Sequence, residues 1–150
     1  MLAFVESLES MATEPSDHII ICGYGLVGEK IVDILLQHNV DIVVIDEDKN
    51  KIDALNERGV PAILGDATSS KVLRSAGIER ARAIAIAMDD DAKNLFAVIT
   101  ARSLNDKIVI ATRANDEFLK DKLKEAGAKF VATPNKSASD ELFRELTKGV

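Results

Sequence analysis

Three glycines within six residues constrain the fold of this chain more than any other feature. They lie in the segment GYGLVG, residues 23–28, which follows the apolar run IIIC and precedes apolar residues at helical spacing. In a strand–loop–helix unit, the first glycine permits a tight turn, the second lets a ligand approach the backbone, and the third lets helix and strand pack closely. The pattern predicts a loop that binds the pyrophosphate of a nucleotide at a helix N-terminus. A tight turn without a ligand would use glycines in the same way.

Six short apolar runs recur along the chain, with segments of helical spacing between them. The runs are continuous instead of alternating with polar residues, which is typical of strands that are covered on both faces. They span residues 19–22, 42–45, 62–64, 83–87, 108–111 and 130–132. This order of elements predicts an α/β fold, a Rossmann-like doubly wound parallel sheet of six strands with helices on both faces.

Length and the N-terminal segment predict the domain organisation. A chain of 150 residues is long enough for one hydrophobic core and too short for two large ones. We therefore expect residues 17–150 to form one nucleotide-binding domain. Residues 1–16 predict a short helix and a linker, because their apolar residues have helical spacing and Pro15 interrupts the segment before the first strand. On composition alone, a remnant of cloning explains this segment equally well.

Composition and charge argue against several classes of function. With 25 Asp and Glu against 19 Lys and Arg, the formal net charge of −6 gives no basic surface of the kind that binds nucleic acid. The one cysteine, Cys22, lies in an apolar run and is typical of a reducing compartment. No apolar stretch is long enough to cross a bilayer, and no secretory signal begins the chain. We therefore expect a cytoplasmic domain that reaches a membrane only through a partner or another segment.

An acidic residue follows the second predicted strand at the distance expected for ribose binding. Asp46 lies 23 residues after Gly23, close to the ~20 residues typical of dinucleotide-binding units. A carboxylate at this place accepts hydrogen bonds from ribose hydroxyls and repels a 2′-phosphate. Glu47 follows it directly. The alternative is that the segment DEDKNK only begins a solvated helix with charges in its first turn.

The segment LGDATS follows the third predicted strand. Its polar groups would lie at the carboxyl edge of the sheet, where they could meet adenine or ribose. The candidate residues there are Gly65, Asp66, Ala67 and Thr68. Capping of the next helix by Asp66, Thr68 or Ser69 is the alternative interpretation.

Charged residues also follow the fourth and fifth predicted strands. MDDDAKN contains three consecutive acids, including Asp89, but no histidine or second acidic cluster accompanies them, so helix capping explains them better than a metal site. Arg113 ends the fifth strand and would face the same crevice, where it could neutralise a phosphate. An ordinary surface arginine is the alternative.

The sequence offers no evident machinery for catalysis. A dehydrogenase needs a proton-transfer group and a substrate region, but His18 precedes the first strand and His38 closes the first predicted helix. Tyr24 is followed four positions later by Gly28, so no Tyr-x-x-x-Lys pair is present, and no G-x-x-x-x-G-K-[ST] phosphate loop occurs. We expect no catalytic residue, no bound metal and no enzymatic activity.

The segments HIIICGYGLVGEKI, VVIDED and LGDATSSKVLRSAGIERARAIAIAMDDD together resemble the RCK domains, also called KTN or TrkA N-terminal domains, of potassium channels and potassium-uptake systems. The resemblance covers residues 17–146. It implies a regulatory module that binds NAD(H), ATP or ADP and assembles as dimers within a larger ring at the cytoplasmic side of a membrane pore. A small NAD-dependent oxidoreductase and a passive assembly domain are the alternatives.

The resemblance also implies which residues contact the nucleotide. Residue 26 is leucine where some members have an arginine that holds phosphates, and residues 112 and 114 are Thr and Ala where calcium-gated members have carboxylates. These departures argue against a preference for triphosphates and against that calcium site. The implied contacts are Gly23, Tyr24, Gly25, Leu26, Val27 and Gly28 in the loop, Asp46 and Glu47 at the ribose, Gly65, Asp66, Ala67 and Thr68 near the adenosine, and Asp89 and Arg113 across the crevice.

Two helical segments carry more apolar residues than contact with one sheet requires. We predict that they form a homodimer interface with help from the last helix. Complete burial within the monomer is the alternative. The apolar residues are Leu95, Phe96, Val98, Ile99 and Leu104 in NLFAVITARSL, and Phe118, Leu119 and Leu123 in DEFLKDKL.

Overall fold

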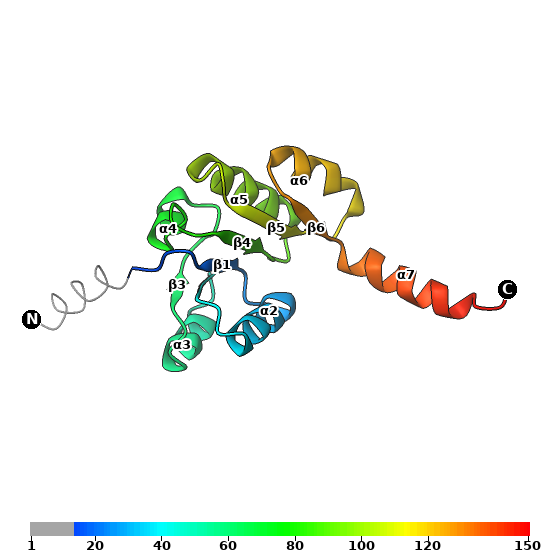
Figure 1. Cartoon of the computed structure of the whole chain (residues 1–150), viewed down its shortest axis with the longest axis horizontal. Coiled ribbons are helices and arrows are strands. Elements are labelled where there is room, and N and C mark those ends of the chain that lie inside the picture. Colours follow the sequence, from blue (N-terminus) through cyan, green and yellow to red (C-terminus); the bar gives the residue numbers. More distant parts are fainter. Residues whose placement is uncertain (1–13) are drawn as a thin grey trace, which may run out of the picture.

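Six parallel strands form the centre of the computed structural model, which describes residues 14–150 (Figure 1). The order in the sheet is β3-β2-β1-β4-β5-β6, which confirms the predicted doubly wound parallel sheet. The strand order changes direction between β1 and β4, and ligands bind at such a point in open α/β sheets. The strands are β1 (Ile19–Cys22), β2 (Ile42–Asp46), β3 (Ala62–Leu64), β4 (Ala83–Ile86), β5 (Val109–Arg113) and β6 (Phe130–Ala132).

Helices cover both faces of the sheet, as predicted. In Figure 1, α2 and α3 lie on one side, while α4, α5 and α6 lie on the other. The helices are α2 (Leu26–Gln37), α3 (Lys49–Glu57), α4 (Ser70–Ser75), α5 (Asp91–Leu104), α6 (Lys120–Ala126) and α7 (Pro134–Leu146), and a short 3-10 helix, η1 (Glu117–Leu119), precedes α6. The predicted N-terminal helix falls mainly on residues 1–13, which lie outside the described part.

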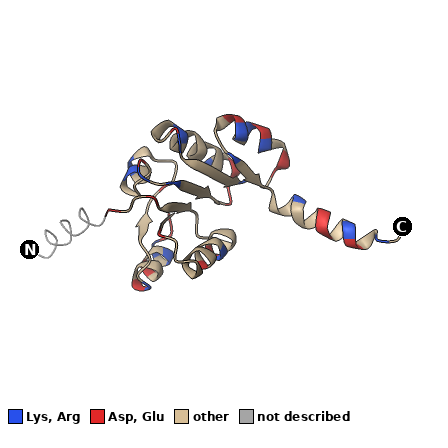
Figure 2. Ribbon diagram, in the orientation of Figure 1, with Lys and Arg blue, Asp and Glu red and all other residues tan. Residues whose placement is uncertain are grey.

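Alternate residues of each strand contribute to two separate hydrophobic cores. In β1, Ile20 and Cys22 pack with α4, α5 and α6, whereas Ile21 packs with Val32 of α2 and Leu55 of α3. Because both faces are covered, no polar alternation is needed along the strand. Charged residues lie mainly on the helices and at strand ends, and the strands themselves are almost free of them (Figure 2).

Aspartate and serine side chains begin most of the helices after the strands. Asp48 accepts hydrogen bonds from backbone amides at the start of α3, Ser69 does so for α4 and Asp90 for α5. The helix-capping interpretation of LGDATS and MDDDAKN therefore holds for Ser69 and Asp90. β5 extends two residues beyond the predicted 108–111, to Arg113, because it pairs with β4 on one side and β6 on the other.

The last helix projects from the body of the molecule (Figure 1). A single residue, Thr133, joins β6 to α7, and no residue of α7 is buried. Leu142, Phe143 and Leu146 are all exposed on it. Among residues 14–150, no helix combines the length and the apolar character needed to span a membrane.

The close contact between α2 and the loop before it requires glycine at residue 28. A Cβ atom there would approach the carbonyl oxygen of Gly23 within 1.8 Å, far inside van der Waals contact. We predict that Gly28→Ala lowers the free energy of unfolding by about 3 kcal/mol, through overpacking against the backbone.

Chemical denaturation measures this difference, with Gly25→Ala as the matched control. A Cβ at residue 25 would meet only Asp89 Oδ1, at 3.9 Å, so the control should change stability by less than about 1 kcal/mol. Equal stability of Gly28→Ala and the unsubstituted chain would contradict the prediction.

Candidate functional site

The glycine loop joins β1 to α2 and places the N-terminus of α2 at the crevice, which lies at the carboxyl ends of β1 and β4. Gly23 has φ +97°, a conformation that favours glycine, and its amide donates to the carbonyl of Ile45 at 2.9 Å. Gly25 is the N-cap of α2 and brings no side-chain acceptor. The amides of the first helical turn therefore lack a side-chain cap, and such a helix N-terminus favours an anion.

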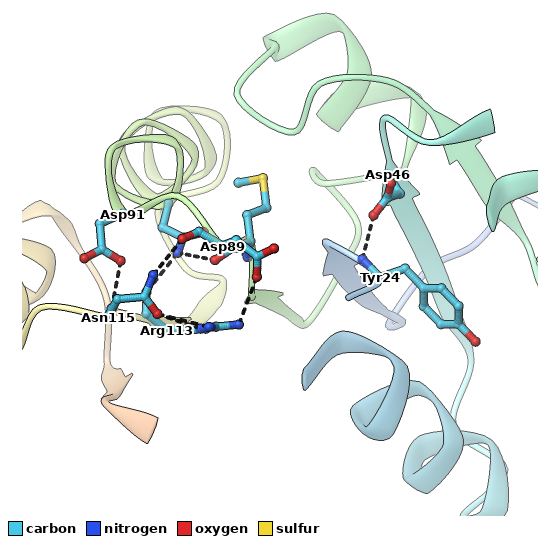
Figure 3. A network of polar contacts seen from close by, with 8 residues as sticks. Tyr24, Asp46, Asp89, Asp91, Arg113 and Asn115 are labelled. Atoms are coloured by element: carbon cyan, nitrogen blue, oxygen red, sulfur yellow. Dashed lines mark hydrogen bonds and ion pairs between the residues drawn. The ribbon is translucent and has the colours of Figure 1, made fainter. Parts of the chain in front are cut away.

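Asp46 connects this loop to the start of α3. One carboxylate oxygen accepts from the Tyr24 amide at 2.7 Å (Figure 3). The other accepts from the Asp48 amide at 2.8 Å. An ionised carboxylate offers about four lone-pair sites, so each oxygen can still accept from a ribose hydroxyl. The same residue can hold the loop in place and bind a ribose.

Two adjoining cavities form the crevice, and both are open to solvent. The first has a volume of about 250 Å³, and the second, on the other side of Gly25 and Asp89, has about 390 Å³. Of the predicted residues, Gly23, Gly25, Asp46, Glu47 and Asp89 line the first cavity, and Tyr24, Gly25, Leu26, Val27, Asp89 and Arg113 line the second. The structure thus brings most of the predicted loop residues together with Asp46, Glu47, Asp89 and Arg113, whereas Gly28 packs against Gly23 and lines neither cavity.

The residues after β3 lie beside these cavities and do not line them. Asp66 accepts hydrogen bonds from the Thr68 amide at 2.8 Å and from the Thr68 hydroxyl at 2.7 Å. These two bonds hold the pKa of Asp66 below its ordinary value. Ala67 is buried, and Gly65 donates its amide to the Asp46 carbonyl at 3.0 Å. This segment forms a turn next to Asp46.

A polar network crosses the other side of the crevice (Figure 3). Arg113 lies 3.4 Å from Asp89 and donates to Asn115 at 3.0 Å. Asn115 donates its side-chain amide to the Asp89 carbonyl and its backbone amide to Asp91, at 2.8 Å for the latter. The guanidinium is therefore held between the loop after β4 and the loop after β5.

Asn94, in the first turn of α5, holds the same two loops together through hydrogen bonds. This role was not predicted from the sequence. Asn94 is fully buried, accepts from the Met88 amide at 3.0 Å, and donates to the carbonyls of Met88 and Arg113. Buried polar groups need such partners. The only sequence signal was its place one turn after the helix cap in MDDDAKN.

Two lysines of the crevice were also missed. Lys51 lines both cavities, and Lys93 lines the first, where it forms an ion pair with Glu47 at 2.9 Å. Each lies in the first turn or two of a helix that follows a strand end, a position that by itself is typical of a solvated surface residue.

Neither histidine lines the crevice, and Cys22, which directly precedes Gly23, does not line it either. His18 is buried at the amino end of β1, with Nε2 2.7 Å from the Ala76 carbonyl oxygen. Burial raises the pKa of the Cys22 thiol far above its usual range, so it stays protonated. Within residues 14–150, no group of His, Cys, Asp and Glu is arranged to hold a metal ion.

Comparisons with known proteins identify relatives of this arrangement. The profile of the TrkA-N domain matches residues 19–134. Potassium channel protein 1 of Methanocaldococcus jannaschii is 36% identical over 121 residues, which are 79% of this chain and 36% of that protein. The chain thus spans about a third of the length of that relative.

Two solved structures share the fold. The TrkA-N domain of the inner membrane protein YbaL from Escherichia coli aligns with a TM-score of 0.85 at 28% identity, covering 89% of this chain and 98% of that one. The Kef CTD of Shewanella denitrificans in its AMP-bound form aligns with a TM-score of 0.73 at 26% identity, covering 87% and 79%.

The lowered pKa of Asp66 predicts how this turn responds to acid. Because the pKa is lower in the folded state than in the unfolded chain, where it is about 3.9, ionised Asp66 stabilises the fold above about pH 4. This stabilisation is lost as pH falls through the folded pKa. The stability difference between the protein and Asp66→Asn should therefore shrink below about pH 4 in urea unfolding. A difference that stays constant from pH 7 to pH 3 would contradict this.

Proposed function

Because the chain belongs to the TrkA-N domain family, we propose that it is a regulatory domain of a potassium channel or potassium-uptake system. In this proposal an adenine nucleotide binds in the crevice and controls ion flux through a conformational change of a dimer or ring. The observation that carries it is the uncapped N-terminus of α2 next to Asp46, which offers an anion site and a ribose site side by side.

The ligand of this proposal is NAD(H), ATP or ADP. Its first phosphate lies on the amides that begin α2, and its ribose hydroxyls donate to Asp46. The AMP-bound state of the Kef CTD supports an adenine nucleotide as the ligand class. The polar groups of Arg113 and Asp89 then face the part of the ligand that follows the first phosphate, which is the next phosphate group in NAD(H), ADP or ATP.

Regulation is favoured over catalysis by the chemistry of the crevice. Its titratable groups are carboxylates, lysines, one arginine and the phenol of Tyr24, which accepts a hydrogen bond from Arg58 at 3.2 Å, and both histidines lie elsewhere. A small NAD-dependent oxidoreductase would need a proton donor close to the nicotinamide. We propose a domain without enzymatic activity that works at the cytoplasmic face of the membrane, through a pore-forming segment or subunit.

A homodimer through α5 and the segment before α6 is part of this proposal. The apolar residues of these segments fall into two groups. Val98 of α5 and Leu123 of α6 are buried in the monomer, whereas Phe96, Ile99 and Phe118 are 58%, 47% and 84% exposed. Exposed apolar side chains in such a group are typical of an interface. The exposed apolar residues of α7 would add to the contact.

The polar network provides a path from ligand to dimer. A phosphate that attracts Arg113 competes with Asp89 for the guanidinium. The Asp89 side chain is 90% exposed, so solvent weakens its ion pair with Arg113. Arg113 is bonded to Asn115, and Asn115 begins the turn that leads to Phe118. A shift of Arg113 therefore moves part of the proposed interface, and a coupling of ~1–3 kcal/mol would be sufficient for regulation.

Discrimination against a 2′-phosphate tests the nucleotide site. Calorimetric titration should give tighter binding of NADH than of NADPH, because the Asp46 carboxylate repels the additional phosphate. Asp46→Asn removes this charge but retains a side-chain oxygen that can accept one backbone bond. We expect this variant to lose most of the preference and to bind NADH about tenfold more weakly.

Asp106→Asn is the matched control, because Asp106 is exposed after α5, away from the crevice. It should bind both nucleotides as the unsubstituted protein does. Tighter binding of NADPH than of NADH by the unsubstituted protein would show the ribose assignment to be wrong.

Charge placed on α5 tests the dimer. Light scattering at micromolar concentration should give the mass of a dimer, and Phe96→Asp should convert it to a monomer, since burial of the new carboxylate is costly. Asn56→Asp, which adds the same charge to an exposed position of α3, should leave the dimer intact. A monomer that Phe96→Asp does not change would count against this interface.

A further inference from the structure

The crevice is acidic, although it is built to receive a phosphate. Five carboxylates and only three cationic side chains line its two cavities, an excess of two negative charges. The carboxylates are Glu29, Asp46, Glu47, Asp89 and Asp90, and the cations are Lys51, Lys93 and Arg113. The lining therefore repels added negative charge even before a ligand enters.

Two of the three cations are already engaged. Lys93 is bonded to Glu47 at 2.9 Å, and Asp66 and Asp90 also attract it. Arg113 lies between Asp89 and Asn115. Of these three crevice cations, Lys51 alone has no ion-pair partner within residues 14–150. A phosphate chain must compete with Glu47 for Lys93 and with Asp89 for Arg113.

The favourable field of the crevice acts on one phosphate position. The start of α2 carries about half a positive charge, and this effect falls off within the first turn. The start of α5 offers less, because Asp90 caps it and Asp91 lies in its first turn. A first phosphate at the glycine loop is therefore stabilised, whereas further phosphates meet the carboxylates around it.

We propose that this excess of carboxylates selects nucleotides by charge, so that the crevice accepts a nucleoside monophosphate or a dinucleotide and discriminates against a free nucleoside triphosphate. The proposal rests on the proposed function, since it concerns the same crevice. The relevant property of the ligand is the number of charges beyond the first phosphate. Glu29, Asp89 and Glu47 are the residues that make the discrimination.

Calorimetric titration with AMP, ADP and ATP tests this selection. The titrations use EDTA, pH 8 and 50 mM salt, where screening is moderate. We expect AMP to bind most tightly and each additional phosphate to weaken binding about three- to fivefold. At 300 mM salt the difference between AMP and ATP should become smaller, because screening weakens the repulsion.

Glu29→Gln removes one carboxylate from the lining without releasing a lysine from an ion pair. It should tighten ATP binding more than AMP binding, since ATP carries about twice the charge. Glu125→Gln, on the exposed surface of α6, is the control and should change neither. ATP that binds as tightly as AMP at 50 mM salt, or an unchanged ratio in Glu29→Gln, would overturn the charge selection. Absence of binding by all three nucleotides and by NADH would instead overturn the proposed function.

Discussion

The close approach of α2 to the end of β1 is the contact on which the crevice depends. Gly28 lies so near the Gly23 carbonyl that no side chain fits between them. This approach places the first turn of α2 directly over the sheet edge, and the absence of a side-chain cap at Gly25 leaves its amides available. The anion site is therefore a consequence of backbone packing, and no charged side chain is needed to create it.

Around that backbone site, carboxylates hold the loops in place, and in the proposed function one of them also binds the ribose. Asp46 holds the loop through the Tyr24 amide while it keeps lone pairs for a ribose. Asp91 holds the loop after β5 through the amides of Asn115 and Asp116. These acids hold the loops around the crevice and also make its lining negative, and the proposed selectivity among nucleotides rests on that negative charge.

Much of this arrangement could be predicted from sequence, because it rests on short-range patterns. Continuous apolar runs and the glycine spacing were sufficient for the doubly wound parallel sheet and the loop, and Asp46 was found by its distance from Gly23. The pairing of Lys93 with Glu47 and the burial of Asn94 joined residues from different strand ends, so local pattern could not supply them. Periodicity likewise could not divide α5 into buried Val98 and exposed Phe96.

The central claim is that a nucleotide in the crevice is sensed at the surface near Phe118. Titration of the isotope-labelled domain with NADH, followed by amide resonances, tests it directly, because NADH has a second phosphate that can reach Arg113. The prediction is that the amides of Gly25 and Leu26 shift together with those of Asn115 and Phe118, all at the same NADH concentration. Shifts confined to the glycine loop, with Asn115 and Phe118 unchanged at saturation, would contradict it and would leave a domain that binds the nucleotide without transmitting the event.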